Sequence, residues 1–158
     1  MITCTFHLNG RALSNLSCPG IGFFPAYSGT GRSRNNANDI AVPNIGPLPP
    51  GLYYIVTRGT GGLVTGIMDW ITSEISGSDR SIWFALYRQD AQIDDMTFIG
   101  NVQRGHFRLH PAGYKGISEG CITLPRLSDF MLLRDALLNT PTIQITASLA
   151  AFGTIQVY

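Results

Sequence analysis

Short runs of alternating residues, rich in β-branched and aromatic side chains, dominate the chain and limit what it can fold into. Such runs have the two-residue period of a strand, and the Gly, Pro, Asn and Asp residues between them are typical of turns. We therefore predict strands at Ile2–Leu8, Leu52–Arg58, Ser81–Arg88, Thr97–Val102, His106–His110, Thr142–Ala147 and Thr154–Tyr158. The predicted fold class is mostly β.

One segment has the period of a helix instead. Leu127–Leu138 repeats apolar residues at a spacing that places them on one helical face, at Phe130, Leu133 and Leu137. Ser128 is a suitable N-cap, Asp129 suits the first turn, and Pro141 prevents continuation beyond the end. We predict one main helix near the C-terminus, packed against the core.

Length and charge narrow the class of protein. The 158 residues suit one domain, 1–158, with a single core, and a hydrophobic content of 44% excludes general disorder. The net charge is +1, which argues against a nucleic-acid binder that neutralises phosphates.

No run approaches the roughly 20 apolar residues of a membrane span. The first residues lack the pattern of a secretory signal, so we expect a cytosolic protein or export that needs no such signal.

Three cysteines do not make a disulfide framework, because an odd number leaves at least one thiol over. Cys4 and Cys18 would pair only in an oxidising compartment. The simpler interpretation is two small buried thiols. Cys121 lies far from both in the sequence.

The segment Ser28–Gly51 is long, polar and rich in Gly, Asn and Pro. A loop of this length inside a compact domain is often functional, so we expect a groove wall or a lid. Its SGTG run lacks the Lys-Ser/Thr ending of a phosphate-binding loop.

The segment Arg104–Pro125 carries most of the chemistry. Strand alternation places the polar residues of its first part on one face, at His106, Arg108 and His110, and Phe107 and Leu109 on the other. We expect the apolar face to meet the core and the polar face to line a groove or meet solvent.

A tight turn is predicted at Ser118-Glu119-Gly120-Cys121. Gly120 permits close approach of a ligand, and backbone N–H groups beside Cys121 suit a developing oxyanion. A thiol nucleophile needs a base, and His110 is near enough in sequence to supply one. On spacing alone, Cys121 is equally well a buried structural thiol and His110 a histidine bonded to backbone.

A zinc site is the competing chemistry for the same residues. Its ligands would be His106, His110 and Cys121. In an extended strand the two imidazoles would lie roughly 13 Å apart, and a fourth ligand is missing. We expect no bound metal.

The segment HPAGYKGISEGCITL resembles the His…Ser-x-Gly-Cys signature of L,D-transpeptidase catalytic domains. The chain is more similar still to small type VI secretion effectors with an L,D-transpeptidase-like fold. The similarity spans essentially the whole chain and includes AYSG at 26–29, Asn35-Asn36, GPLPPGLY at 46–53, FRLHP at 107–111 and the final FGTIQV at 152–157. It implies an L,D-transpeptidase-like β-sandwich or barrel.

The resemblance also implies roles for individual residues. Cys121 would be the nucleophile and His110 its general base, while Ser118 and Gly120 would shape the oxyanion turn. Glu119 departs from the larger family, which carries histidine at that place, and no role is carried over to it.

Two further residues are implied to contact the substrate. Arg108 would hold a carboxylate in its guanidinium fork, although a solvated surface charge is the alternative. His106 would contact the substrate or support the residues that do.

The implied reaction is acyl transfer at the diaminopimelate–D-Ala bond of peptidoglycan tetrapeptide stems, by hydrolysis (L,D-carboxypeptidase) or by exchange of the terminal D-amino acid (L,D-transpeptidase). It needs no metal or organic cofactor. The implied toxin is made in the cytoplasm, leaves through the type VI secretion machinery, acts in the periplasm of target bacteria and is opposed by an immunity protein. A non-catalytic peptidoglycan-binding module of the same fold is the alternative.

Overall fold

A computed structural model of the chain describes residues 1–57, 80–113 and 120–158. Within these residues the protein is mostly β with one α-helix near the C-terminus, as predicted. The strands are β1 (Ile2–Phe6), β2 (Ser14–Cys18), β3 (Gly22–Ala26), β4 (Gly51–Thr57), β5 (Phe84–Arg88), β6 (Met96–Ile99), β7 (Val102–Gly105), β8 (Arg108–Pro111), β9 (Ile122–Leu124), β10 (Ile143–Thr146) and β11 (Leu149–Val157). The helices are α2 (Leu127–Leu138) and the short 3-10 turns Gly31–Ser33, Ala37–Asp39 and Arg80–Ile82.

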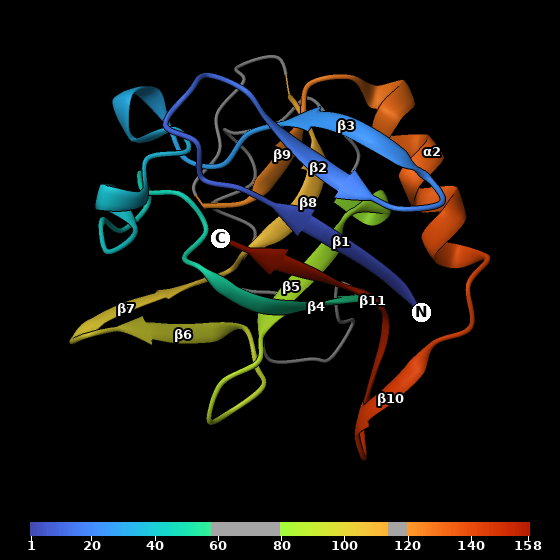
Figure 1. Ribbon diagram of the computed structural model, residues 1–158. Coiled ribbons are helices and arrows are strands. Elements are labelled where there is room, and N and C mark those ends of the chain that lie inside the picture. The colour runs from blue at the N-terminus through green and yellow to red at the C-terminus, as the bar shows by residue number, and fades with distance from the viewer. Residues whose placement is uncertain (58–79, 114–119) are drawn as a thin grey trace.

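One curved sheet organises the described part of the chain. Its strands follow the order β3-β2-β1-β11-β4-β5-β8-β9, with β10 paired to β11. At the two outer strands, Tyr27 just after β3 forms a bridge with Thr123 in β9, with N···O distances of 3.0 and 2.8 Å. This bridge nearly closes the sheet into a barrel (Figure 1).

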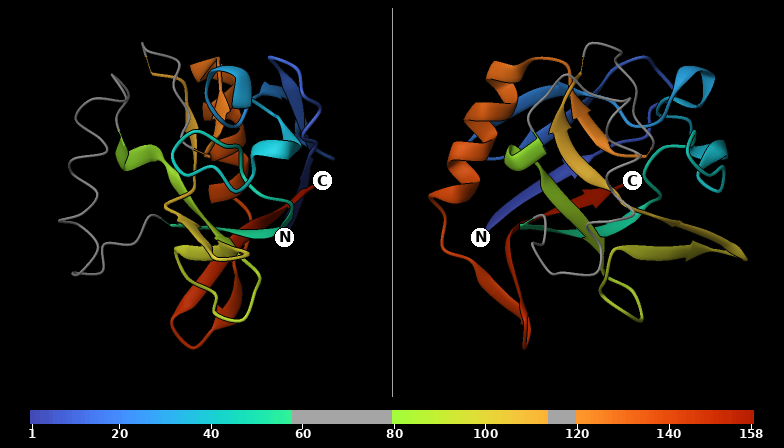
Figure 2. Two further views of the ribbon diagram at one scale, coloured as in Figure 1. Left: turned by 90° about the vertical axis from the view of Figure 1, so that its left-hand side faces the viewer. Right: turned by 180° about the vertical axis from the view of Figure 1, so that it is seen from behind.

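The helix α2 packs along one side of the barrel (Figure 2). It has the predicted bounds, and its core-facing residues are fully buried as predicted, at Phe130, Leu133 and Leu137. The N-cap is Arg126, which makes no side-chain cap, so the expectation of a Ser128 cap is wrong. Burial of the apolar face therefore stabilises this helix more than its cap does.

The predicted strand Thr97–Val102 is instead a hairpin. A turn at Gly100-Asn101 separates β6 from β7, which pair as a two-stranded ribbon beside the main sheet. In Figure 1 this ribbon projects from the barrel. The predicted strand Ser81–Arg88 is also shorter, because the 3-10 turn Arg80–Ile82 occupies its start and the strand β5 begins at Phe84.

The long loop between β3 and β4 is held by internal hydrogen bonds. The backbone N–H of Ser28 donates to Asn35 Oδ1 at 2.8 Å, and the backbone N–H of Leu48 donates to Ser28 Oγ at 2.7 Å. Ser28 and Asn35 are fully buried. The loop is therefore a fixed part of the fold, built from two 3-10 turns.

Cys4 and Cys18 form a disulfide between β1 and β2. The antiparallel register pairs Thr5 with Ser17 and Phe6 with Leu16, which places the two cysteines opposite one another with a Cα–Cα distance of 4.3 Å. Both are buried, but the interpretation as two separate thiols is wrong because the register brings the side chains together.

Reduction of this disulfide is expected to lower the free energy of unfolding by about 3 kcal/mol, because a cross-link over a loop of this length restricts the unfolded chain. The melting temperature should fall by roughly 10 °C in reductant. Thermal melts with and without dithiothreitol measure the difference, and the double variant Cys4→Ala/Cys18→Ala should show none. Equal melts of the wild-type protein in both conditions would contradict the expectation.

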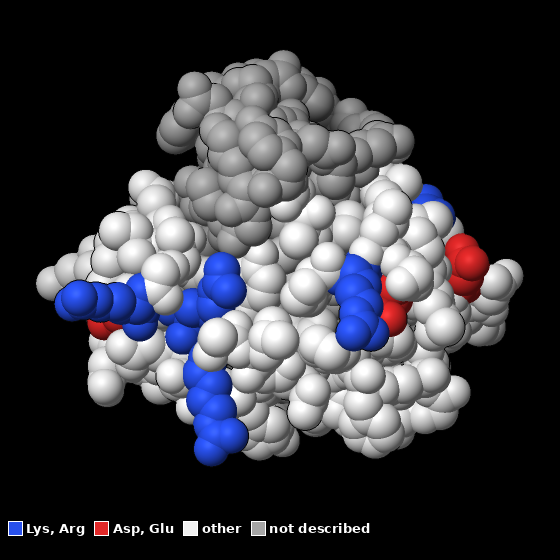
Figure 3. Space-filling model, turned by 90° about the horizontal axis from the view of Figure 1, so that it is seen from above, with Lys and Arg blue, Asp and Glu red and all other residues white. Residues whose placement is uncertain are grey.

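The described surface carries few charges. The face in Figure 3 is mostly uncharged, in keeping with a charged-residue content of 13%. Among the described residues, no helix is long and apolar enough to cross a membrane.

Candidate active site

Cys121 lies on a turn directly before β9. Gly120 adopts φ +93°, and a Cβ atom there would meet the guanidinium of Arg104 at 2.5 Å and the ring of Phe107 at 2.9 Å. Glycine is therefore required before the cysteine. The Cys121 side chain is nearly buried, and its thiol donates to the carbonyl oxygen of His106 at an S···O distance of 3.9 Å.

Two arginines favour the ionised form of this thiol. The guanidinium groups of Arg104 and Arg108 both lie within electrostatic reach of Cys121, and both side chains are only 4% exposed. A positive charge near a thiol stabilises its thiolate, and burial weakens the screening of that charge by water. The two arginines therefore act against the burial of Cys121, which by itself disfavours the thiolate.

His110 lies on the strand next to Cys121. The parallel register pairs Leu109 with Ile122 and His110 with Thr123, so the residue opposite His110 lies two positions after Cys121, which directly precedes β9. His110 Nδ1 donates to the Pro111 carbonyl oxygen at 2.7 Å, which leaves Nε2 to accept from the Thr123 hydroxyl at 3.3 Å.

The His110 imidazole is enclosed. It is 2% exposed and stacks on the ring of Trp83 with a centroid distance of 4.3 Å. Burial lowers the pKa of His110 to about 4; the hydrogen bond to Pro111 opposes this shift, and the positive charge of Arg108 adds to it. His110 is therefore neutral at pH 7.

This lowered pKa makes stability depend on pH. Above pH 6.5 the imidazole is neutral whether the chain is folded or unfolded. Between pH 6.5 and about pH 4 only the unfolded chain binds the proton, so stability falls by about 3 kcal/mol over that interval. Urea unfolding at pH 7 and pH 4 measures the loss, and His110→Gln should lose correspondingly less. The same loss in both proteins would contradict the assignment.

His106 is not part of the strand that follows it. It lies between β7 and β8 with φ +57°, and its imidazole is 29% exposed. Arg108 and His110 do share β8, but both are buried. The prediction that these three residues share a face open to a groove or solvent is therefore wrong for Arg108 and His110, because other parts of the fold cover that face of β8.

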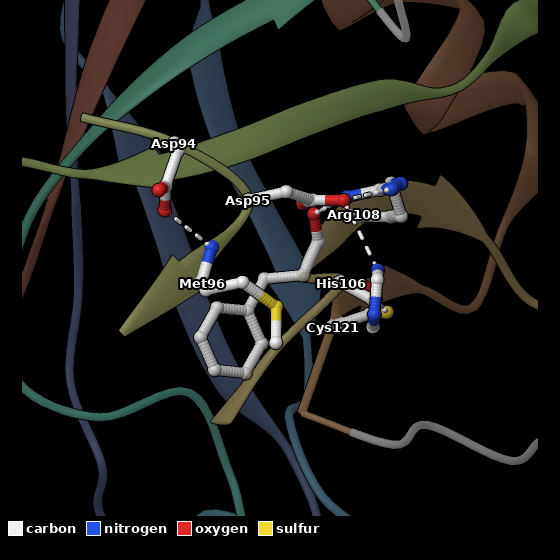
Figure 4. A network of polar contacts seen from close by, with 7 residues as sticks. Asp94, Asp95, Met96, His106, Arg108 and Cys121 are labelled. Atoms are coloured by element: carbon white, nitrogen blue, oxygen red, sulfur yellow. Dashed lines mark hydrogen bonds and ion pairs between the residues drawn. The ribbon is translucent and has the colours of Figure 1, made fainter. Parts of the chain in front are cut away.

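Arg108 and His106 both bind Asp95, just before β6. The guanidinium of Arg108 donates to the two Asp95 carboxylate oxygens at 2.6 and 2.8 Å, and His106 Nδ1 lies 3.1 Å from Oδ2 (Figure 4). Burial of Asp95 raises its pKa, but the hydrogen bonds from Arg108 and His106 outweigh this effect, so the pKa lies below its usual value. The carboxylate stays charged.

The fork of Arg108 is thus engaged within the protein. The interpretation as a solvated surface charge is wrong, since the side chain is buried. Its role in holding a substrate carboxylate stays a prediction, and it requires the guanidinium to exchange Asp95 for the substrate.

The structure describes only part of the predicted turn at Ser118–Cys121. Gly120 and Cys121 are described, whereas Ser118 and Glu119 fall outside the described residues. In the described part of the chain, no group of three histidine, cysteine, aspartate or glutamate side chains is arranged to bind a metal.

Several residues around the site escaped sequence reasoning. Asp95 and Arg104 bind other site residues or the neighbouring loop, while Thr123 and Trp83 enclose His110. The signal available for Arg104 was its place in the segment Arg104–Pro125. Asp95 had none, because only the β6–β7 hairpin brings it beside His106.

The fold and the site together define a nearly closed β-barrel that carries a thiol, two histidines and two arginines around the start of β8 and β9. Residues 22–148 match the model of the Tlde1 domain, and the chain belongs to this family of type VI secretion effectors directed at peptidoglycan. No curated protein matches the chain.

Proposed function

We propose that this protein is a cysteine enzyme that cleaves the diaminopimelate–D-Ala bond of peptidoglycan tetrapeptide stems, as an L,D-carboxypeptidase, or exchanges the terminal D-amino acid, as an L,D-transpeptidase. Residues 1–158 act as its one catalytic domain. The observation that carries the proposal is the thiol of Cys121, held after a required glycine within reach of two buried arginines, in a member of the Tlde1 family.

Cys121 is the nucleophile in this proposal. Its sulfur attacks the carbonyl carbon of the diaminopimelate residue, the C–N bond breaks, and D-alanine leaves with a proton on its amine. Backbone N–H groups of the Gly120 turn stabilise the oxyanion of the tetrahedral intermediate, with Ser118 shaping the same turn. A thioester at Cys121 results, and water or a second D-amino acid then takes up the acyl group.

His110 is the proposed base for the thiol proton. Its Nδ1 is fixed by the Pro111 carbonyl, so the lone pair is on Nε2. To take the proton, Nε2 exchanges the Thr123 hydroxyl for the thiol of Cys121, two residues earlier in the chain. Hydrogen bonds of this kind are often longer before substrate binds than in the substrate complex.

The family supports the biological setting. A type VI secretion effector requires the secretion machinery for export and an immunity protein that protects the producer. We propose that the protein is made in the cytoplasm, needs no signal peptide and attacks the cell wall from the periplasm of target bacteria. The Cys4–Cys18 disulfide is compatible with an oxidising site of action.

The test is to incubate the purified protein with tetrapeptide muropeptides and to identify the products by mass spectrometry. We expect tripeptide products, and exchanged stems when a second D-amino acid such as D-methionine is added. Pentapeptide muropeptides are the control and should stay intact. Binding to peptidoglycan without product would support the non-catalytic module instead.

A further inference from the structure

Asp95 and His106 form a pair that the proposed acylation does not use. They lie at the open base of the β6–β7 hairpin, where Met96 pairs with Gly105. The backbone N–H of His106 donates to the Asp95 carbonyl oxygen at 2.9 Å, and the side chains meet at 3.1 Å. A Cβ atom at Gly105 would lie 2.4 Å from the same carbonyl, so the close approach depends on glycine.

The pairing fixes which nitrogen of His106 carries the proton. A carboxylate only accepts hydrogen bonds, so His106 Nδ1 donates to Asp95 and the lone pair of the neutral ring is on Nε2. Arg108 holds the same carboxylate from the other side with two hydrogen bonds. Asp95, which lies in another segment of the chain, thereby fixes the orientation of the His106 imidazole.

His106 is also the histidine that solvent can reach beside the thiol. Its own carbonyl oxygen contacts the Cys121 sulfur, and His106 lines a surface hollow of about 160 Å³ together with Asn44, Gln103 and Arg104. Figure 4 shows the His106 ring joined to the Asp95 carboxylate by a dashed contact. His110, in contrast, is enclosed.

His106 adopts a φ of +57°, in the left-handed region where histidine, asparagine and aspartate are found more often than other residues with side chains. Glycine would fit this turn as well, but it would leave the Asp95 carboxylate without the imidazole.

We propose that His106, oriented by Asp95, activates the water that hydrolyses the thioester at Cys121. This inference rests on the proposed function. Nε2 of His106 accepts a proton from water as the water oxygen bonds to the thioester carbonyl carbon. The C–S bond then breaks, the tripeptide leaves with a new carboxyl group, and the proton on Nε2 passes to the Cys121 sulfur. His106 is the catalytic residue of this step, and Asp95 is a positioning residue.

The experiment follows the acyl-enzyme itself. Wild-type protein, His106→Gly and His106→Asn are mixed with tetrapeptide muropeptide, and intact-protein mass spectrometry measures the fraction acylated at Cys121 over time. Both substitutions suit a positive φ, so the fold should be kept, and circular dichroism checks this. His7→Asn is the matched control, because His7 is an exposed histidine outside the site.

We expect acylation to continue in both His106 variants while hydrolysis slows about 100-fold, so that the acyl-enzyme accumulates. Added imidazole should restore hydrolysis in His106→Gly, an effect that a purely structural role of the side chain would not produce. Asp95→Asn should also slow hydrolysis, but less acyl-enzyme should accumulate than in the His106 variants.

Hydrolysis at the wild-type rate in folded His106 variants, or equal loss of acylation and hydrolysis without rescue by imidazole, would overturn the inference and leave the proposed function intact. If the wild-type protein and Cys121→Ala both leave the muropeptide unchanged, the proposed function fails and the inference fails with it.

Discussion

Replacement of Cys121 by alanine is expected to abolish cleavage of tetrapeptide stems, with a loss of at least about 1,000-fold in rate. Without the sulfur no thioester forms, and the residual arginines and backbone donors have no nucleophile to assist. Release of D-alanine from purified tetrapeptide muropeptides measures the loss.

The substitution should leave the fold intact. Cys121 is nearly buried, but alanine removes only its sulfur, and the turn depends on Gly120 rather than on the thiol. We expect a melting temperature within a few degrees of the wild-type value.

A second measurement separates the nucleophile from the other cysteines. Cys4 and Cys18 are joined in a disulfide, so a thiol-directed acylating probe should label the protein once, at Cys121. The variant Cys4→Ala/Cys18→Ala, although less stable, should keep that reactivity at a temperature where it is folded. Stem cleavage by Cys121→Ala at the wild-type rate would rule out the proposed chemistry.

Much of the architecture follows from local pattern. The helix α2 was predictable to the residue because its apolar spacing, its first-turn Asp129 and the following Pro141 all agree. The strands β1, β4 and β10 were predictable because each alternates or is rich in β-branched and aromatic residues.

The missed strands lack such a pattern. β2 reads SNLSC and β3 reads GFFPA, in which polar and small residues replace the usual alternation and Pro25 argues against a strand. β3 is an outer strand that pairs with β2, where proline is tolerated. β9 has only three residues, too few to show a strand pattern, and its pairing with β8 makes it a strand. Tertiary pairing, not local preference, forms these strands.

The candidate site, like the fold, could be predicted only in part from local sequence. Residue type and spacing made Cys121 and His110 candidates, and the family resemblance gave them the roles of nucleophile and base, which stay predictions. The partner of Arg108 could not be predicted from the sequence, because Asp95 lies in another segment and approaches Arg108 only when β6 and β7 pair. Long-range hydrogen bonds of this kind leave no periodic trace in a sequence.

Arg104 links the long loop to the cysteine turn. Its guanidinium donates to the backbone carbonyl oxygens of Ile40, Gly46 and Pro47, and it lies against the position of Gly120. The side chain is 4% exposed, so its charge is compensated by these buried carbonyl groups rather than by water. One residue of β7 therefore joins the loop to the backbone beside the thiol.

Arg104→Met should consequently be among the most damaging single substitutions outside the hydrophobic core. Methionine fills part of the volume but leaves three carbonyl groups without their donor, and we expect the free energy of unfolding to fall by about 3–5 kcal/mol. Urea unfolding measures this loss, and hydrogen exchange of the loop amides locates it. Arg32→Met is the matched control, because Arg32 is an exposed arginine of the same loop and its loss should cost less than about 0.5 kcal/mol. If Arg104→Met is as stable as Arg32→Met, water can replace the guanidinium, and the loop does not depend on it to stay beside Cys121.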